Sequence, residues 1–142
     1  MIKKLNFLLS IVFIIGLFNL VPVTKTNATN PAISEKAKVE VYYFHYTRRC
    51  ATCQAVENEA KKDLTALYPE LMKSGKIVFK SINLDEENST AIAETCKAEG
   101  QSLLIICGKK RFDLTENAFM NARTKPELLK QEIRKTIDPL IK

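Results

Sequence analysis

The pattern of apolar residues changes its period at residue 50, and this change does most to constrain the fold. Residues 38–46, KVEVYYFHY, are rich in β-branched and aromatic side chains, which favour a strand. From Cys50 onward apolar residues recur at steps of three and four between charged positions, which predicts an amphipathic helix ending near Tyr68, before Pro69. The chain therefore passes from strand to helix at a C-x-x-C pair, Cys50 and Cys53.

The pattern of apolar residues also predicts the elements in the middle of the chain. We expect strands at 77–84 and 103–107, the second apolar at every position and therefore buried on both faces. Between them we expect a short helix, with its N-cap at Asn88 or Ser89 and Gly100 terminating it. A tight turn then leads into residues 111–114, which we expect to form an antiparallel partner strand.

The C-terminal part ends in a helix. Residues 115–123 predict a loop or a short helical segment. Thr124 and Glu127 form a capping box with Pro126 in the first turn. Four apolar residues are expected to share one face of the helix before Pro139 closes it: Leu128, Leu129, Ile133 and Ile137.

The N-terminal segment predicts export across a membrane. Lys3 and Lys4 precede a nearly uninterrupted apolar run at 5–23, and a short polar tail ends at Ala28. This is the layout of a secretory signal peptide, with an uncleaved membrane anchor as the alternative because the run is long. Residues 1–28 are therefore expected to be the signal or anchor, and the remainder to be periplasmic or extracellular.

What remains is enough for one compact domain. A polar linker at 29–36 leads into a domain at 37–142. Three of the 22 basic residues lie in residues 1–28, which leaves 19 against 16 acidic residues, a net charge of +3. The lysines are scattered among acids and no nucleic-acid motif appears, so a solvated surface is the better interpretation and no nucleic-acid partner is expected.

The C-x-x-C pair predicts redox chemistry. A cysteine that begins a helix lies where unpaired backbone N–H groups and the helix dipole stabilise a thiolate, the form that attacks a disulfide. Arg48 and Arg49 add positive charge beside Cys50, and His45 is placed to tune its pKa. Cys53, one turn further, would be shielded and would resolve the mixed disulfide.

The order of elements, β-α-β-α-β-β-α, together with the C-x-x-C at the first strand-to-helix junction, resembles the thioredoxin fold. The resemblance implies an α/β domain with a central mixed four-stranded sheet flanked by helices. It implies a thiol-disulfide oxidoreductase with catalytic Cys50 and Cys53, acting as a monomer on protein thiols or disulfides with a further redox partner. More narrowly, RRCATCQ, SINLD, QSLL and DLTENAFM resemble small exported thioredoxin-like proteins labelled nitrophenyl compound nitroreductase subunit.

The sequence departs from the thioredoxin pattern at three places. Arg49 stands where thioredoxins have tryptophan, so no redox potential carries over. Gln101 and Ser102 occupy the place of the loop with the cis-proline that contacts substrate, and we expect their peptide bond to be trans because a cis bond to serine is costly. The buried acid on the first strand falls at Phe44; Glu57 could substitute for it, although a surface glutamate is the preferred interpretation.

Two other interpretations of the pair remain open. The disulfide could be a structural staple in a redox-inert binding module, although so short a loop removes little unfolded-state entropy. The dithiol could instead hold a metal or metalloid, for which His45 could add a nitrogen ligand. We expect no resident metal and no cofactor, because no motif resembles a flavin or nicotinamide site.

Two further cysteines make the count even. Cys107 lies five strand residues beyond Ser102, about 16 Å at 3.3 Å per residue, whereas Cys96 precedes the loop before that strand. Bridged cysteines need Cα atoms within about 7 Å, so we expect Cys96 and Cys107 to be buried, free and inert.

Overall fold

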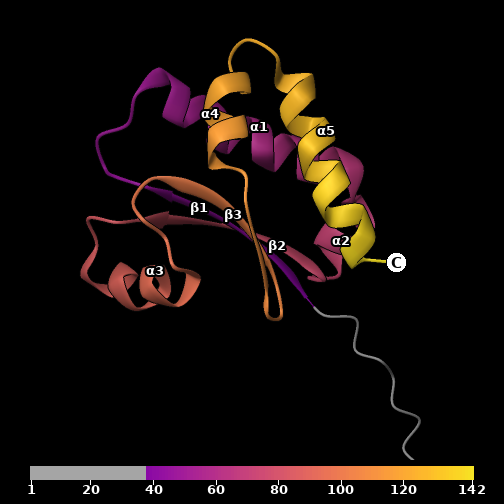
Figure 1. Ribbon diagram of the computed structural model, residues 1–142, viewed down its shortest axis with the longest axis horizontal. Helices are drawn as coiled ribbons and strands as arrows, with labels where there is room; N and C mark the ends of the chain where they lie inside the picture. The colour runs from indigo at the N-terminus through magenta and orange to yellow at the C-terminus, as the bar shows by residue number, and fades with distance from the viewer. Residues whose placement is uncertain (1–37) are drawn as a thin grey trace, which may run out of the picture. The chain divides into compact units, whose positions relative to one another are not determined.

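The structure, a computed structural model, describes residues 38–142. The predicted signal at 1–28 and linker at 29–36 lie outside the described residues, as does residue 37. The described part has strands and helices in the predicted order (Figure 1). The segment predicted as a loop or a short helix forms α4, and α2 is a further short helix. The elements are β1 (Val39–His45), α1 (Ala51–Leu67), α2 (Pro69–Lys73), β2 (Ile77–Asn83), η1 (Glu87–Ser89), α3 (Thr90–Cys96), β3 (Ser102–Cys107), β4 (Lys110–Asp113), α4 (Thr115–Asn121), α5 (Pro126–Ile137) and η2 (Asp138–Leu140).

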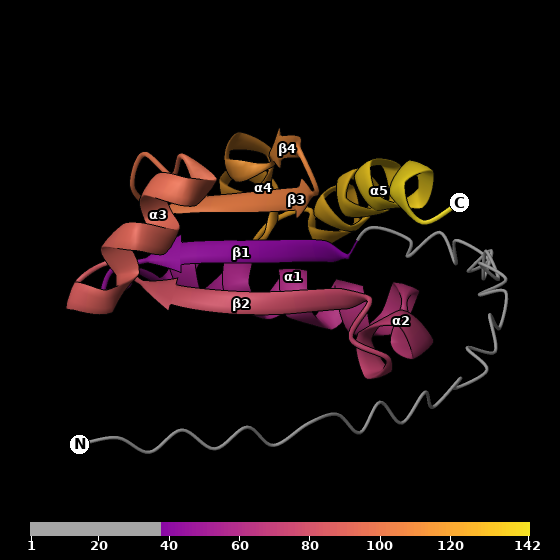
Figure 2. The ribbon, with the colours of Figure 1, turned by 90° about the horizontal axis from the view of Figure 1, so that it is seen from below.

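The four strands form one mixed sheet in the order β2-β1-β3-β4 (Figure 2). β1 runs parallel to β2 and antiparallel to β3, and β4 is antiparallel to β3. The two strands with near-continuous apolar sequence, β1 and β3, take the inner places, where both neighbours satisfy their backbone groups. This topology confirms the expected thioredoxin-like fold.

Side chains alternate between the two faces of the sheet. Val39, Val41 and Tyr43 of β1 belong to the larger hydrophobic cluster, whereas Tyr42 and Phe44 belong to the smaller one. Helices α1, α2, α4 and α5 lie over the first face and α3 lies over the second (Figure 1). Within residues 38–142 no helix is both long and apolar enough to span a bilayer.

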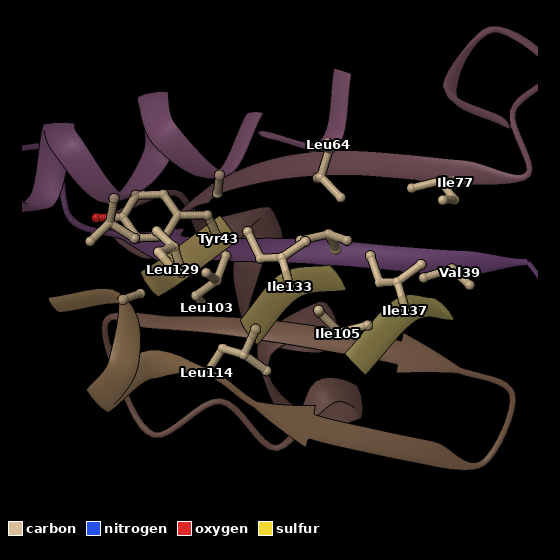
Figure 3. Packing of buried hydrophobic residues seen from close by; sticks show 14 of the residues in the cluster. Val39, Tyr43, Leu64, Ile77, Leu103, Ile105, Leu114, Leu129, Ile133 and Ile137 are labelled. Atoms are coloured by element: carbon tan, nitrogen blue, oxygen red, sulfur yellow. The ribbon is translucent and has the colours of Figure 1, made fainter. Parts of the chain in front are cut away.

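Helix α5 closes the larger cluster with one row of side chains. Leu129, Ile133 and Ile137 have no exposed surface and lie against residues of β1 and β3 such as Tyr43 (Figure 3). The prediction that Leu128 shares this row is wrong, because its side chain is 42% exposed. One residue rotates a helix by about 100°, which turns Leu128 away from the row that its neighbour Leu129 begins.

The predicted end of α3 at Gly100 is also wrong. The helix stops at Cys96, and Lys97 adopts the left-handed conformation with φ 52°. Arg111 of β4 donates hydrogen bonds to the carbonyl oxygens of Cys96 at 2.9 Å and of Lys97 at 3.1 Å. The guanidinium of Arg111, which is distant in sequence, therefore satisfies the last carbonyl oxygens of α3. The sequence of the helix alone does not reveal this contact.

The N-caps of α5 and α3 in the structure also differ from the predicted ones. The N-cap of α5 is Lys125, without a side-chain hydrogen bond, so the capping box is wrong. The hydroxyl of Thr124 instead donates to the carbonyl oxygen of Met120 at 3.3 Å, because residues 115–121 form α4 and the chain is still leaving that helix. Ser89 precedes α3 as predicted, but it is already helical and its hydroxyl makes no capping bond.

Cys96 and Cys107 lie on opposite faces of the sheet. Cys96, the last residue of α3, is a free thiol buried in the smaller cluster, where burial raises its pKa. Cys107 is buried at the edge of the larger cluster. Because the sheet separates the two sulfurs, the prediction that they form no bridge is confirmed.

Asp63 of α1 is the buried acid with the least compensation in the described residues. It is 3% exposed and its Oδ2 has no hydrogen-bond partner. Burial raises the pKa of Asp63, and the nearby charge of Lys130 on α5 only partly offsets this. The carboxylate therefore costs folding free energy near neutral pH.

Asp63→Asn is expected to raise the free energy of unfolding at pH 7 by about 1 kcal/mol. Because the pKa is higher in the folded state, the folded protein binds the proton more tightly. The penalty is absent below the unfolded pKa and grows as pH rises toward the folded pKa. Urea denaturation at a series of pH values should show the gain shrinking on acidification; a gain independent of pH would contradict the ionic explanation.

Candidate active site

The site lies where the chain leaves β1 and enters α1. The connecting loop is fastened to the end of the neighbouring parallel strand β2. The backbone N–H of Thr47 donates to Asp85 at 2.7 Å, and the Asn83 side chain donates to the Thr47 hydroxyl at 2.9 Å. The N–H of Leu84 donates to the carbonyl of His45 at 2.7 Å. These bonds fix the point at which α1 begins.

The two cysteines differ in exposure as predicted. Cys50 is exposed and is the N-cap of α1, in extended conformation with φ −80° and ψ 166°. Cys53 is 4% exposed. The two form a disulfide with Cα atoms 5.1 Å apart, and the backbone N–H of Cys53 points at the Cys50 sulfur at 3.1 Å. After reduction this N–H and the helix dipole would stabilise a thiolate on Cys50.

Tyr43 anchors the first turn of α1 to the sheet. Its buried hydroxyl donates to the carbonyl oxygen of Cys53 at 2.8 Å. Burial raises the pKa of Tyr43 to about 12, so the phenol stays protonated and remains a donor throughout the ordinary pH range. The sequence analysis missed this role, since β1 carries three aromatic residues whose direction only the strand register decides.

The two arginines have different surroundings. Arg48 is exposed, whereas Arg49 forms an ion pair with Glu57 on the next turns of α1. Burial opposes ionisation of Glu57, but hydrogen bonds from Ser81 and Arg49 and the nearby charge of Arg49 hold its pKa below the usual range. Glu57 is therefore a partly exposed, ion-paired residue on the surface of α1, and the charge of Arg49 is partly neutralised beside Cys50.

Glu57→Gln is expected to lower the pKa of the Cys50 thiol in the reduced protein, because it leaves the charge of Arg49 uncompensated. Replacing both Arg48 and Arg49 by Gln should raise it. Thiolate absorbance, titrated against pH, measures both shifts. Glu59→Gln is the matched control, since Glu59 pairs with Lys62 instead; an unchanged curve in Glu57→Gln would contradict the electrostatic role.

His45 is the last residue of β1 and is buried, with an exposed fraction of 7%. Its ring stacks on Tyr43, with centroids 5.7 Å apart, and its Nδ1 lies 3.0 Å from the carbonyl oxygen of Tyr46. A carbonyl only accepts, so Nδ1 carries the proton. The ring contributes to the electrostatics of Glu57 and Asp85, while its effect on Cys50 stays a prediction.

The loop before β3 also contacts the disulfide, through Gln101. The Cys53 sulfur lies 3.6 Å from Oε1 of Gln101. Ser102 is 6% exposed and its hydroxyl donates to the carbonyl of Gly100 at 3.1 Å. The described residues contain no cis peptide bond, so the expectation of a trans Gln101–Ser102 bond is confirmed. Gln101 thus contacts the sulfur of Cys53, whereas the Ser102 hydroxyl is used within its own loop.

A polar pocket of about 400 Å³ adjoins this loop. Its lining residues are Lys97, Glu99, Gln101, Ser102, Arg111, Asp113 and Thr115. The sequence analysis missed Arg111 and Asp113, which become neighbours of the loop only through the pairing of β3 with β4. No group of three or more His, Cys, Asp or Glu side chains within residues 38–142 is arranged to hold a metal ion.

The topology and the disulfide at the start of α1 define the described part of the chain as a thioredoxin-like domain with a C-x-x-C site. No protein-family model matches the sequence, and no curated protein matches it either. Among solved structures, the chain is similar to the germline-specific thioredoxin Deadhead from Drosophila melanogaster, with 21% identity and a TM-score of 0.46 over 70% of this chain and 81% of that chain. A thioredoxin from Trypanosoma brucei brucei is 18% identical, with a TM-score of 0.44 over 72% of this chain and 78% of that chain.

Proposed function

We propose that the protein is an exported thiol-disulfide oxidoreductase that exchanges disulfides with partner proteins through Cys50 and Cys53. The observation that carries the proposal is the asymmetry of the pair. Cys50 is exposed at the helix N-cap and its sulfur faces a backbone N–H, while Cys53 is buried beside it. A structural staple has no need of one exposed, electrostatically activated sulfur.

The exchange proceeds in two steps. In the reducing direction the Cys50 thiolate attacks a substrate disulfide, which forms a mixed disulfide and releases the first substrate thiolate. Cys53 then attacks the Cys50 sulfur, closes the protein disulfide and releases the second substrate thiolate. Both leaving thiolates take up protons, and the protein loses two. The reverse sequence oxidises a substrate dithiol, and the compartment's redox poise sets the direction.

Substrate would approach the exposed sulfur between the loop at 46–49 and the loop that carries Gln101. We propose that Gln101 and Ser102 bind the substrate segment through their backbone groups, because the Ser102 hydroxyl already donates to Gly100 and the Gln101 side chain already contacts the Cys53 sulfur. Export rests on the predicted signal at 1–28, and the protein is proposed to act as a monomer. The narrower resemblance to the nitroreductase-subunit family stays a prediction.

The test is the redox midpoint of the Cys50–Cys53 pair. The purified protein is equilibrated in glutathione buffers, alkylated and analysed by mass spectrometry to count thiols at each cysteine. A reversible midpoint between about −120 and −270 mV is expected for an exchange enzyme. Cys50→Ser is the control and should exchange nothing. A pair that glutathione never opens would overturn the proposal in favour of a binding module with a structural disulfide.

A further inference from the structure

Gln101 is the polar side chain that reaches the buried sulfur from outside α1. The Cys53 sulfur and Gln101 Oε1 are 3.6 Å apart, although 48 residues separate them in the sequence. In the disulfide this sulfur carries no hydrogen, so the two atoms are only in contact. After reduction the same sulfur is either a thiol that can donate or a thiolate that accepts.

Several bonds from other elements hold the loop that carries Gln101. Arg111 of β4 binds the carbonyl oxygens of Cys96 and Lys97, which are the last residues before the loop. Ser102, the first residue of β3, is paired with β1 directly after Gln101. Both ends of the loop are therefore held in place by other elements, and this fixes the position from which the Gln101 side chain reaches Cys53.

We propose that Gln101 is a positioning residue for the resolving sulfur, on the basis of the exchange function proposed above. In the reduced protein its Oε1 accepts a hydrogen bond from the Cys53 thiol. As Cys53 loses its proton, the amide turns and its N–H2 donates to the thiolate. A neutral amide offers both an acceptor and donors, so it can follow the sulfur through both protonation states.

The step affected is the resolution of the mixed disulfide. The Cys53 thiolate attacks the Cys50 sulfur; the bond between the two protein sulfurs forms and the bond from Cys50 to the substrate sulfur breaks. The electron pair of the broken bond leaves with the substrate thiolate. That thiolate takes up, through water, the proton that Cys53 released. Gln101 neither gains nor loses a proton, and it orients the attacking sulfur.

Two substitutions test this role with oxidised glutathione as the probe. Reduced protein is mixed with it, quenched with acid at intervals, and the glutathione adduct on Cys50 is followed by mass spectrometry across a range of pH. Gln101→Leu should slow the loss of the adduct about two- to tenfold, the loss of one ordinary hydrogen bond, and leave its formation unchanged. Gln101→Glu should shift the midpoint of the pH profile for that loss upward, because a carboxylate disfavours a nearby thiolate.

Glu99→Gln is the matched control on the same loop, since Glu99 is exposed, and it should behave as the wild type. If Gln101→Glu leaves the pH profile unmoved and Gln101→Leu leaves the rate unchanged, the positioning role is overturned while the exchange function stands. A merely structural role would slow both steps alike without moving the profile, which also overturns it. A wild-type protein that forms neither the adduct nor the Cys50–Cys53 disulfide would overturn the exchange function itself.

Discussion

A Cys53→Ser variant is expected to accumulate a stable mixed disulfide on Cys50, whereas the wild-type protein releases it. Cys50 keeps its exposed position at the N-cap of α1, so the first attack is preserved. The buried neighbour that should expel the substrate is then a hydroxyl, a far weaker nucleophile. The resolution step should slow at least about a thousandfold, as is usual when a reacting nucleophile is removed.

The measurement is mass spectrometry of the variant after incubation with oxidised glutathione or a disulfide-bonded protein. Cys50→Ser should form no adduct at the motif, and the double variant should be equally inert. Cys96→Ala is a control, since the Cys96 thiol is buried at the end of α3, on the opposite face of the sheet from α1. Turnover of Cys53→Ser at the wild-type rate would show that some other thiol resolves the intermediate.

Ile133→Ala is expected to destabilise the domain by about 2–5 kcal/mol. Ile133 has no exposed surface and lies in the middle of the α5 row that covers β1 and β3 (Figure 3). Its removal leaves a cavity between helix and sheet that neighbouring side chains fill only partly. Urea denaturation with the wild-type protein measured in parallel gives the change in the free energy of unfolding.

Leu128→Ala is the matched control for this prediction. It removes an aliphatic side chain from the same helix, but Leu128 is 42% exposed. Its loss should cost less than about 1 kcal/mol, since little apolar area returns to water. Equal losses at the two positions would show that α5 packs by a different face from the one described.

Local pattern predicted most of the fold. The β-branched and aromatic content of 38–46 and the apolar run at 103–107 correspond to β1 and β3, with ends within a residue. The helix from Cys50 to Tyr68 corresponds to α1, whose buried residues recur at steps of three and four. These signals are strong because each long element must bury apolar side chains against the core. The apolar residues therefore recur with the period of the helix or strand that carries them.

The ends of helices were predicted less well, because distant residues compete for the terminal backbone groups. Gly100 was a reasonable terminator for α3, but Arg111 from β4 binds the last carbonyls four residues earlier. Thr124 was a reasonable N-cap, but its hydroxyl bonds back to Met120 at the end of α4. A cap is worth only about 1 kcal/mol, so one tertiary contact is enough to relocate it.

For the active site, sequence alone determined that an exposed sulfur begins a helix and that a second sulfur follows one turn later. That much is local, since helix geometry and the preceding strand require it. Only the tertiary structure decided that Glu57 neutralises Arg49, that Tyr43 anchors the first turn, and that Gln101 meets Cys53. The Tyr43 contact depends on the register of the sheet, since a shift of one residue would turn that side chain to the other face. The Gln101 contact depends on how α1 lies against the loop before β3.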